Sequence, residues 1–430
     1  MFITISFCII FNIAFSFEKI KKGENMEEKG YKLYGYRWVV LASFMLVNIA
    51  IQILWISYAP ISGPAAKFYN VNDLKIGLLA MLFMIAFLPL SLPVSWAIDT
   101  IGFKKSVSIG VILMGIFGLI RGIAGKNFNL VLISTIFLAI SQPFLLNSWT
   151  KVAALWFSME ESATAVGLVT LSNLLGTAAG MALTPILIEK HSIPMVQLIY
   201  GVFAFISALI FIIFAKEKPP TPPCKEGEQV RALMLDGLKH AFKVKSFLIY
   251  LLISFIGMGI FNGILTWIEN IIRPRGFTPI HAGTLGALIL VGGILGALIM
   301  PVLSDKKKKR VFFIFLGFVL CFPGLLGLTY AKNEYLLYLS GFFMGFFLVS
   351  ASPIGMQYAA EITRPTPEGT SNGIIQFFGQ ASVVFVYLMD ALKTKNGSFT
   401  PALLLAFVLM IISSIFILFL KDTDNLKKQN

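Results

Sequence analysis

Long apolar stretches recur along this 430-residue chain, and their lengths predict a protein built almost entirely of membrane-spanning helices. A helix needs about 20 apolar residues to cross roughly 30 Å of hydrocarbon, where the backbone must satisfy its own hydrogen bonds. We find twelve such stretches, at residues 37–62, 73–97, 105–123, 128–153, 163–188, 194–215, 246–270, 281–304, 311–330, 335–360, 370–392 and 400–420.

The twelve stretches form two sets of six, separated by a charged, proline-bearing segment. We therefore expect an all-α membrane protein with two pseudo-symmetric six-helix bundles. In the separating segment, a proline-rich stretch predicts a stiff spacer, and apolar residues at helical spacing predict an amphipathic helix on the cytoplasmic leaflet. The expected divisions are an N-terminal extension at 1–30, a first bundle at 31–215, a linker at 216–245, a second bundle at 246–420 and a tail at 421–430.

Residues 1–17 are apolar but lack the basic leader and the small-residue cleavage site of a signal peptide. Two interpretations stay open: translation begins at Met26, or the segment is a short membrane-associated leader. A thirteenth spanning helix is less favoured, because it would add an odd helix to a symmetric set of twelve.

Charge indicates the orientation of the helices. The chain has 35 Lys and Arg against 21 Asp and Glu, a net charge of +14. Placing both termini and the linker in the cytoplasm puts most Lys and Arg there, as the positive-inside rule requires. We expect a multi-pass plasma-membrane protein in contact with the lipid bilayer. No basic face of a soluble module is present, so we expect no nucleic-acid partner.

The sequence gives no sign of a cofactor, a metal site or an enzyme. Its three cysteines and three histidines are scattered without ligand spacing. There is no phosphate-binding loop and no HExxH or GxSxG motif, so we expect neither nucleotide hydrolysis nor an intramembrane enzyme.

Charged residues at the helix ends repeat between the two halves. Asp99 follows the second stretch and Asp305 the eighth, while Glu161 opens the fifth stretch and Glu368 the eleventh. The two offsets agree to within one residue, which indicates an internal repeat. An acid followed by a basic turn can pair reversibly with a neighbouring helix start. We predict cytoplasmic gating by these residues, namely Asp99, Lys104, Lys105, Glu161, Asp305 and Glu368, and ordinary solvated charges at Lys306 to Lys309.

Twelve helices with Asp99-Thr-Ile-Gly-Phe-Lys-Lys after the second resemble the major facilitator superfamily. Four further blocks resemble its feline leukaemia virus subgroup C receptor (FLVCR) family: Trp55-Ile-Ser-Tyr58, Trp96 to Gly102, Lys151 to Phe157 and Glu361 to Gly373. The resemblance implies the major facilitator fold, a central cavity and alternating access by rocking of the bundles.

Pairs of glycines four residues apart allow helix backbones to approach closely in lipid. Such pairs occur at Gly176 and Gly180, at Gly292 and Gly296, and at Gly341 and Gly345. The superfamily resemblance implies that helices five and eight lie across the bundle interface, so we expect a sliding contact between these two helices, with tight packing inside one bundle as the alternative.

Polar residues inside membrane helices mark helix contacts or a solute path, because they are costly in lipid. The first half offers Asn48, Gln52, Trp55, Tyr58, Gln142, Asn147 and Asn173, and the second offers Asn262, Trp267, Glu269, Gln357, Asn372, Gln376 and Gln380. Trp55 is the strongest candidate, since an indole face attracts a cation by roughly 0.5 to 2 kcal/mol.

The FLVCR resemblance implies a pocket for choline-like ammonium groups, with an aromatic pair on helices one and seven and glutamines on helices four and eleven. Trp55, Gln142 and Gln380 match this pattern, but Asn262 stands where the second aromatic residue is expected. That departure puts choline itself in doubt. Glu269 could attract a cation or carry a proton, or could be a rim residue paired with Arg273 or Arg275.

We therefore expect a monomeric, secondary active or facilitative transporter of a small polar or cationic metabolite, with substrate contacts at Trp55, Tyr58, Gln142, Asn262, Glu269, Gln376 and Gln380. The alternatives are an exporter of amphipathic or organic anionic, porphyrin-like compounds and a membrane receptor that transports nothing.

Overall fold

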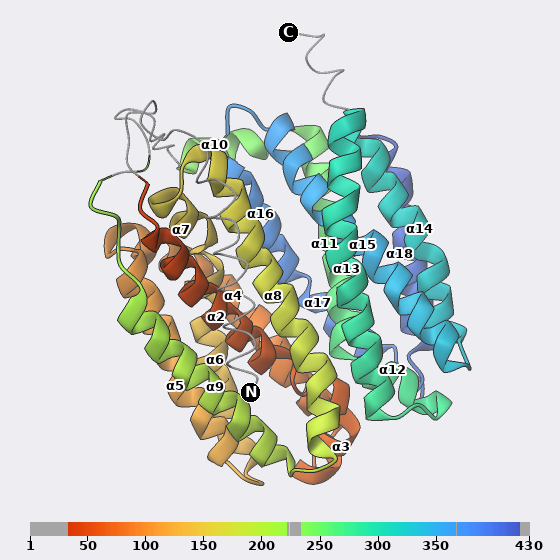
Figure 1. Cartoon of the computed structure of the whole chain (residues 1–430). Coiled ribbons are helices and arrows are strands. Elements are labelled where there is room, and N and C mark those ends of the chain that lie inside the picture. The colour runs from red at the N-terminus through yellow and green to blue at the C-terminus, as the bar shows by residue number, and fades with distance from the viewer. Residues whose placement is uncertain (1–32, 222, 224–233, 367, 422–430) are drawn as a thin grey trace. The chain divides into compact units, whose positions relative to one another are not determined.

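The structure is a computed structural model that describes residues 33–221, 223, 234–366 and 368–421. In these residues, twelve helical segments are long and apolar enough to cross a membrane (Figure 1). They are Tyr36–Tyr69, Asp73–Thr100, Phe103–Ile123, Phe128–Trp156, Glu161–Ile188, Ile193–Phe214, Lys245–Thr266, Pro279–Lys307, Arg310–Tyr330, Glu334–Ile362, Thr370–Ala391 and Thr400–Ile417. The predicted twelve helices are confirmed. The extension at 1–30 lies outside the described residues.

The first segment is not one continuous helix. Helix α2, Tyr36–Ile56, is followed by the 3-10 turn η2, Ala59–Ile61, and the short helix α3, Ser62–Tyr69. Pro60 explains the break, because it has no N–H to donate and its ring collides with the carbonyl four residues earlier, at Ile56. The apolar pattern continues through this break, so the predicted end at residue 62 was too early.

The seventh segment is also interrupted. Helix α11, Lys245–Thr266, ends before Trp267, and the short helix α12, Ile268–Ile272, follows. Trp267 is fully buried, and its indole N–H donates to the carbonyl of Val386 at 2.8 Å. The predicted end at residue 270 was therefore too late, and Glu269 lies beyond the span.

By its contacts the chain separates into two compact units. Among the described residues, the first comprises 33–55, 89–176, 191–221 and 223, and the second comprises 56–88, 177–190, 234–366 and 368–421. Segments 56–88 and 177–190 precede the linker in sequence but pack with the helices that follow it. The bundle boundaries expected from the sequence remain a prediction.

In the first unit, α5 (Phe103–Ile123) packs between α6 (Phe128–Leu146) and α9 (Ile193–Phe214). Glycines bring α5 and α9 together backbone to backbone. A Cβ at Gly118 would lie 3.3 Å from the Cα of Gly201, and one at Gly122 would lie 2.5 Å from the backbone nitrogen of Leu198. Side chains beside these glycines are therefore enclosed between the two helices.

In the second unit, α13 (Pro279–Lys307) and α14 (Arg310–Tyr330) pack against α15 (Glu334–Ile362). Gly292 and Gly296 face the carbonyls of Phe342 and Phe346, and Gly345 faces that of Ile289. These glycines thus join α13 to α15, not to the fifth spanning helix. The expectation of a sliding contact at Gly292 and Gly296 was wrong.

The fifth and eighth spanning helices, α8 (Met159–Ile188) and α13, do meet, but at other glycines. A Cβ at Gly283 would lie 2.6 Å from the carbonyl oxygen of Met181, and Gly286 faces the Met181 side chain. Gly176 instead lies against α2, where a Cβ would be 2.6 Å from the carbonyl oxygen of Ile49. Spacing alone identified close-packing glycines but not their partners.

The predicted amphipathic helix of the linker is described from Met234 onward as α10, Met234–Ala241. It is held by the hydroxyl of Thr366, which donates to the carbonyl of Gly237 at 3.1 Å, and His240 lies 3.2 Å from the carbonyl of Arg364. The remaining helices are α4 (Asp73–Thr100), α7 (Trp149–Trp156), α16 (Glu368–Ala381), α17 (Val383–Ala391) and α18 (Thr400–Ile417).

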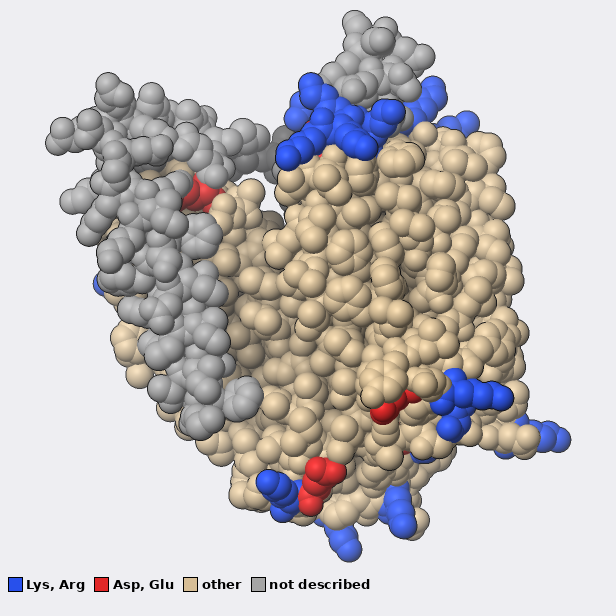
Figure 2. Space-filling model, turned by 45° about the vertical axis from the view of Figure 1, so that its right-hand side comes forward, with Lys and Arg blue, Asp and Glu red and all other residues tan. Residues whose placement is uncertain are grey.

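Charged residues gather at the helix ends. On the face shown in Figure 2, Lys, Arg, Asp and Glu lie near the two ends of the helices, and uncharged residues cover the band between them. Exposed apolar side chains on α13 include those of Leu298, 61% exposed, and Val302, 51% exposed. Such a band suits hydrocarbon on the outside.

Candidate functional site

Four polar side chains form a connected cluster among α2, α7 and α8 in the first unit. The amide of Gln52 donates to Asn173 Oδ1 at 2.5 Å, and the amide of Asn173 donates to Asn48 Oδ1 at 3.2 Å. The indole of Trp149 also donates to Asn48 Oδ1, at 3.0 Å. Because Asn173 accepts from the amide nitrogen of Gln52, the cluster fixes the direction of the Gln52 side chain.

Two glutamine oxygens in the first unit have no partner. Gln52 Oε1, on α2, and Gln142 Oε1, on α6, are buried and accept no hydrogen bond within the described residues. Their side chains are 7% and 4% exposed. A buried amide oxygen without a donor costs about 1 to 3 kcal/mol, so each such oxygen suits a ligand that brings one.

Trp55 lies three residues after Gln52 on α2, so the two side chains share one face of that helix. Its side chain is half-buried, near the end of the helix. An aromatic face beside an amide oxygen can hold a cation that also donates hydrogen bonds. Trp55 and Gln142 both belong to the first unit.

Tyr58, also predicted to touch substrate, lies after the end of α2 and belongs to the second unit. It is 2% exposed, and its hydroxyl lies 3.0 Å from the hydroxyl of Tyr69. The two rings meet edge to face with centroids 6.2 Å apart. Tyr58 is therefore part of the packing between η2 and α3.

The remaining predicted contacts come from α11 and α16 in the second unit. Asn262 is 8% exposed, and Gln376 and Gln380 are half-buried. The two helices pack where a Cβ at Gly379 would lie 3.4 Å from Met258 Cε. Asn262 is one helical turn beyond Met258 and Gln380 adjoins Gly379, so the structure places these two residues on neighbouring helices.

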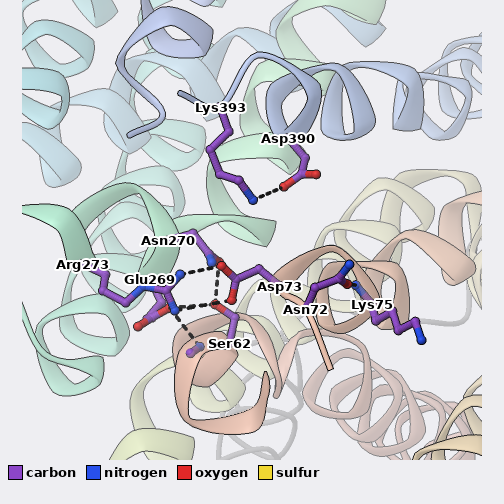
Figure 3. Close-up of polar contacts among 10 residues, drawn as sticks. Ser62, Asn72, Asp73, Lys75, Glu269, Asn270, Arg273, Asp390 and Lys393 are labelled. Atoms are coloured by element: carbon purple, nitrogen blue, oxygen red, sulfur yellow. Dashed lines mark hydrogen bonds and ion pairs between the residues drawn. The ribbon is translucent and has the colours of Figure 1, made fainter. Parts of the chain in front are cut away.

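Glu269 is the centre of a polar network in the second unit, shown in Figure 3. Its carboxylate accepts from the Ser62 hydroxyl at 2.8 Å and from the Gly63 N–H at 3.1 Å, and lies 3.5 Å from Arg273. Arg273 also pairs with Asp73 at 2.6 Å. We call these residues the Glu269 network. It ties α3 and the start of α4 to α12 and the 3-10 turn η3, Arg273–Arg275.

Burial dominates the electrostatics of Glu269. The side chain is 2% exposed, and loss of water raises the pKa of its carboxyl above the ordinary value. Arg273 and the hydrogen bonds from Ser62 and Gly63 oppose this rise, and Asp73 adds to it. Since a carboxylate in water has no such penalty, the pKa of Glu269 depends on whether the network is closed.

The interpretation of Glu269 as a residue paired with Arg273 agrees with this geometry. Arg275 instead donates to the carbonyl of Ala331 at 2.9 Å, and burial lowers the pKa of its guanidinium. Asp390 pairs with Lys393 at 2.9 Å.

The predicted gating residues of the first unit have partners that spacing did not indicate. Asp99 pairs with Lys151, on α7, at 2.7 Å. The backbone N–H of Lys104 donates to Glu217 at 2.8 Å, so Glu217 caps the start of α5. The Lys105 side chain is exposed. Glu161 is buried and lies 3.4 Å from Arg37 at the start of α2.

In the second unit, Arg310 at the start of α14 pairs with Asp305 and, at 3.1 Å, with Glu361. Glu361 also accepts from the amide of Gln357 at 3.0 Å. Glu368 is the first residue of α16, but its side chain is not among those that the structure describes. The repeat is thus not exact, because Asp99 pairs with Lys151 on another helix, whereas Asp305 pairs with Arg310 five residues later.

Sequence reasoning missed Arg37, Lys151, Glu217 and Glu361 as partners. Each lies near a helix end, and only the packing of helices distant in sequence brings it to its partner. Among the described residues, no group of three or more His, Cys, Asp or Glu could hold a metal ion.

Comparison with known proteins identifies the family. Residues 33–387 and 271–430 match the model of the Major Facilitator Superfamily. The choline/ethanolamine transporter FLVCR1 of Mus musculus is 30% identical over 398 residues, covering 84% of this chain and 70% of that protein. This chain belongs to the Major Facilitator Superfamily and is of the FLVCR type.

Further relatives agree with this placement of the FLVCR-type chain. The choline/ethanolamine transporter FLVCR2 of Homo sapiens is 26% identical over 388 residues, covering 84% of this chain and 74% of that protein. A bacterial homologue of the human lysosomal transporter Spinster has the same fold, with a TM-score of 0.65, 14% identity, and coverage of 90% of this chain and 96% of that one. The predicted major facilitator fold is confirmed.

The FLVCR-type chain is therefore an integral, multi-pass membrane transporter of a small molecule. Its relatives are transporters rather than enzymes.

Proposed function

We propose that this FLVCR-type transporter moves a small ammonium metabolite of the choline or ethanolamine kind by alternating access. The observation that carries this proposal is the pair of buried, partnerless oxygens at Gln52 and Gln142, with Trp55 on the same face of α2 as Gln52. Choline brings a quaternary cation and one hydrogen-bond donor, its hydroxyl, whereas ethanolamine brings an ammonium group and a hydroxyl that both donate. The named relatives that transport these two compounds support the same class.

The unpaired atoms also argue against an organic anion. An anion needs donors, whereas the atoms without a partner at Gln52 and Gln142 are acceptors. Neither glutamine carries a positive charge that would attract a carboxylate. A porphyrin-like substrate is therefore less well supported than an ammonium compound.

The Glu269 network supports the alternating-access part of the proposal. It joins a segment that precedes the linker to one that follows it, through a few hydrogen bonds and ion pairs. Such contacts can break and re-form during a transport cycle. We propose that they close the extracellular side, that both termini are cytoplasmic, and that the protein acts as a monomer in the plasma membrane.

The test is binding and uptake by purified protein. In proteoliposomes, wild type takes up radiolabelled choline or ethanolamine, and unlabelled substrate competes while a porphyrin does not. Replacing Trp55 by Ala raises the choline Kd about 2- to 30-fold, the range expected for losing one cation–π contact.

The matched control is Trp96→Ala, since Trp96 is 68% exposed on α4 and lies outside the proposed site. It should leave the choline Kd unchanged. Asn262→Ala and Gln380→Ala are tested in the same assay. Absence of choline and ethanolamine binding by the wild type, or equal losses in both tryptophan variants, would contradict the proposed function.

A further inference from the structure

One buried arginine lies in the last turn of an apolar span and donates hydrogen bonds to neutral acceptors. Arg121 is on α5 and is 1% exposed. Its guanidinium donates to the carbonyl of Leu54 at 2.9 Å and to Gln197 Oε1 at 2.8 Å. A charged side chain within a membrane span is costly, which makes a functional role the first hypothesis.

The glycines of α5 and α9 place this arginine. Gly118 and Gly122 lie three residues before it and one residue after it, and both contact the backbone of α9 directly. A Cβ at Gly118 would also lie 3.6 Å from Leu54 Cδ1. Arg121 is therefore held between α9, which supplies Gln197, and the end of α2.

The Leu54 carbonyl belongs to the same peptide unit as the backbone nitrogen of Trp55. A peptide unit is planar, so a hydrogen bond that fixes the carbonyl of Leu54 also fixes the plane that leads to the Cα of Trp55. This peptide lies in the last turn of α2, just before the break that precedes Pro60. Carbonyls in a last helical turn lack partners further along the helix.

The charge of Arg121 also fits this place. The C-terminal end of a helix carries a partial negative charge, which a cation stabilises. A planar guanidinium holds its N–H donors in a rigid fork, which suits two acceptors in fixed positions on different helices, whereas the three donors of an ammonium group rotate. The two acceptors, the Leu54 carbonyl and Gln197 Oε1, therefore suit the guanidinium of an arginine better than the ammonium group of a lysine.

We propose that Arg121 is a positioning residue that holds the end of α2 and so sets the direction of the Trp55 indole. The effect on substrate rests on the proposed function, in which Trp55 faces an ammonium group. The effect on Trp55 itself does not, and can be measured without any substrate.

The experiment labels the protein with 5-fluorotryptophan and records fluorine NMR spectra without substrate. The Trp55 signal is assigned by its loss in Trp55→Phe. We expect Arg121→Lys and Arg121→Met to shift or broaden the Trp55 signal while leaving the Trp267 signal in place. Gln197→Ala, which removes one anchor and keeps the charge, should produce a smaller change of the same kind.

Met114→Ala is the control, because Met114 is fully buried on the same helix, seven residues before Arg121. It should lower thermal stability without moving the Trp55 signal. An unmoved Trp55 signal in folded Arg121→Lys and Gln197→Ala protein would overturn the proposal.

Choline binding then tests the link to function. We expect Arg121→Lys to raise the choline Kd about tenfold and to add little in a Trp55→Ala background, as coupled sites do. Additive losses would overturn the claim that Arg121 acts through Trp55. If wild type binds no choline, the proposed function fails while the NMR result still decides the positioning role.

Discussion

At the scale of single residues, stability and binding conflict at Gln142. Its amide oxygen is buried without a partner, whereas Asn173 makes hydrogen bonds to Gln52, Asn48 and the Val169 carbonyl. A buried oxygen that waits for a ligand lowers the stability of the empty protein. The two amides should therefore respond differently to replacement by leucine.

We predict that Gln142→Leu leaves the ligand-free protein as stable or raises its stability by about 1 kcal/mol, while it weakens choline binding. Asn173→Leu should instead lower stability, because it leaves its partners unpaired. Thermal unfolding with and without choline measures both effects. A lower melting temperature for ligand-free Gln142→Leu would show that its oxygen has a partner in the empty state.

At the scale of helices, the apolar pattern predicted which spanning helices exist and in what order, but not where a helix is interrupted. The thickness of the hydrocarbon alone was enough to predict twelve helices, and most predicted ends lie within a few residues of the observed ends. The breaks at Pro60 and Trp267 were missed, because both segments stay apolar through the break. The partners of glycines and charges, such as Gly292 or Asp99, depend on which helices meet, and a single sequence does not contain that information.

The Glu269 network makes a prediction about pH at this scale. Burial raises the pKa of Glu269 in the closed network, and opening returns it toward the ordinary glutamate value. The closed form therefore binds the proton more tightly. Acid should favour the closed network, and closure should weaken as pH rises through the raised pKa. Asp73 and Arg273, the charged groups that face Glu269, belong to the same network.

The measurement uses Ala65→Cys in a protein whose native cysteines are replaced by serine, because Ala65 is fully buried on α3. Labelling by a membrane-impermeant maleimide should rise with pH relative to the same protein carrying Glu269→Gln. That ratio removes the pH dependence of the maleimide reaction. Asp390→Asn, outside the network, should keep the wild-type response. A ratio that stays constant with pH would exclude Glu269 as the titrating group.

At the scale of the whole molecule, composition and repetition predicted the fold, and the family match confirms it. The candidate site was predicted less completely. Trp55 and Gln142 came from polar positions in apolar helices and from resemblance, but the partnerless state of Gln52 and Gln142 is a property of packing. The position of Arg121 between α2 and α9 is likewise visible only in three dimensions.

The orientation of the chain in the membrane follows from the distribution of charge and remains a prediction. The exposed lysines 306–309 end α13 and precede α14, while Lys190 lies between α8 and α9. Positive-inside topology places the first group in the cytoplasm and Lys190 outside. In cysteine-free protein expressed in intact cells, Lys190→Cys should react with an impermeant maleimide, and Lys307→Cys should react only after the membrane is opened. Reaction of Lys307→Cys in intact cells would reverse the orientation, and the Glu269 network would then close the cytoplasmic side.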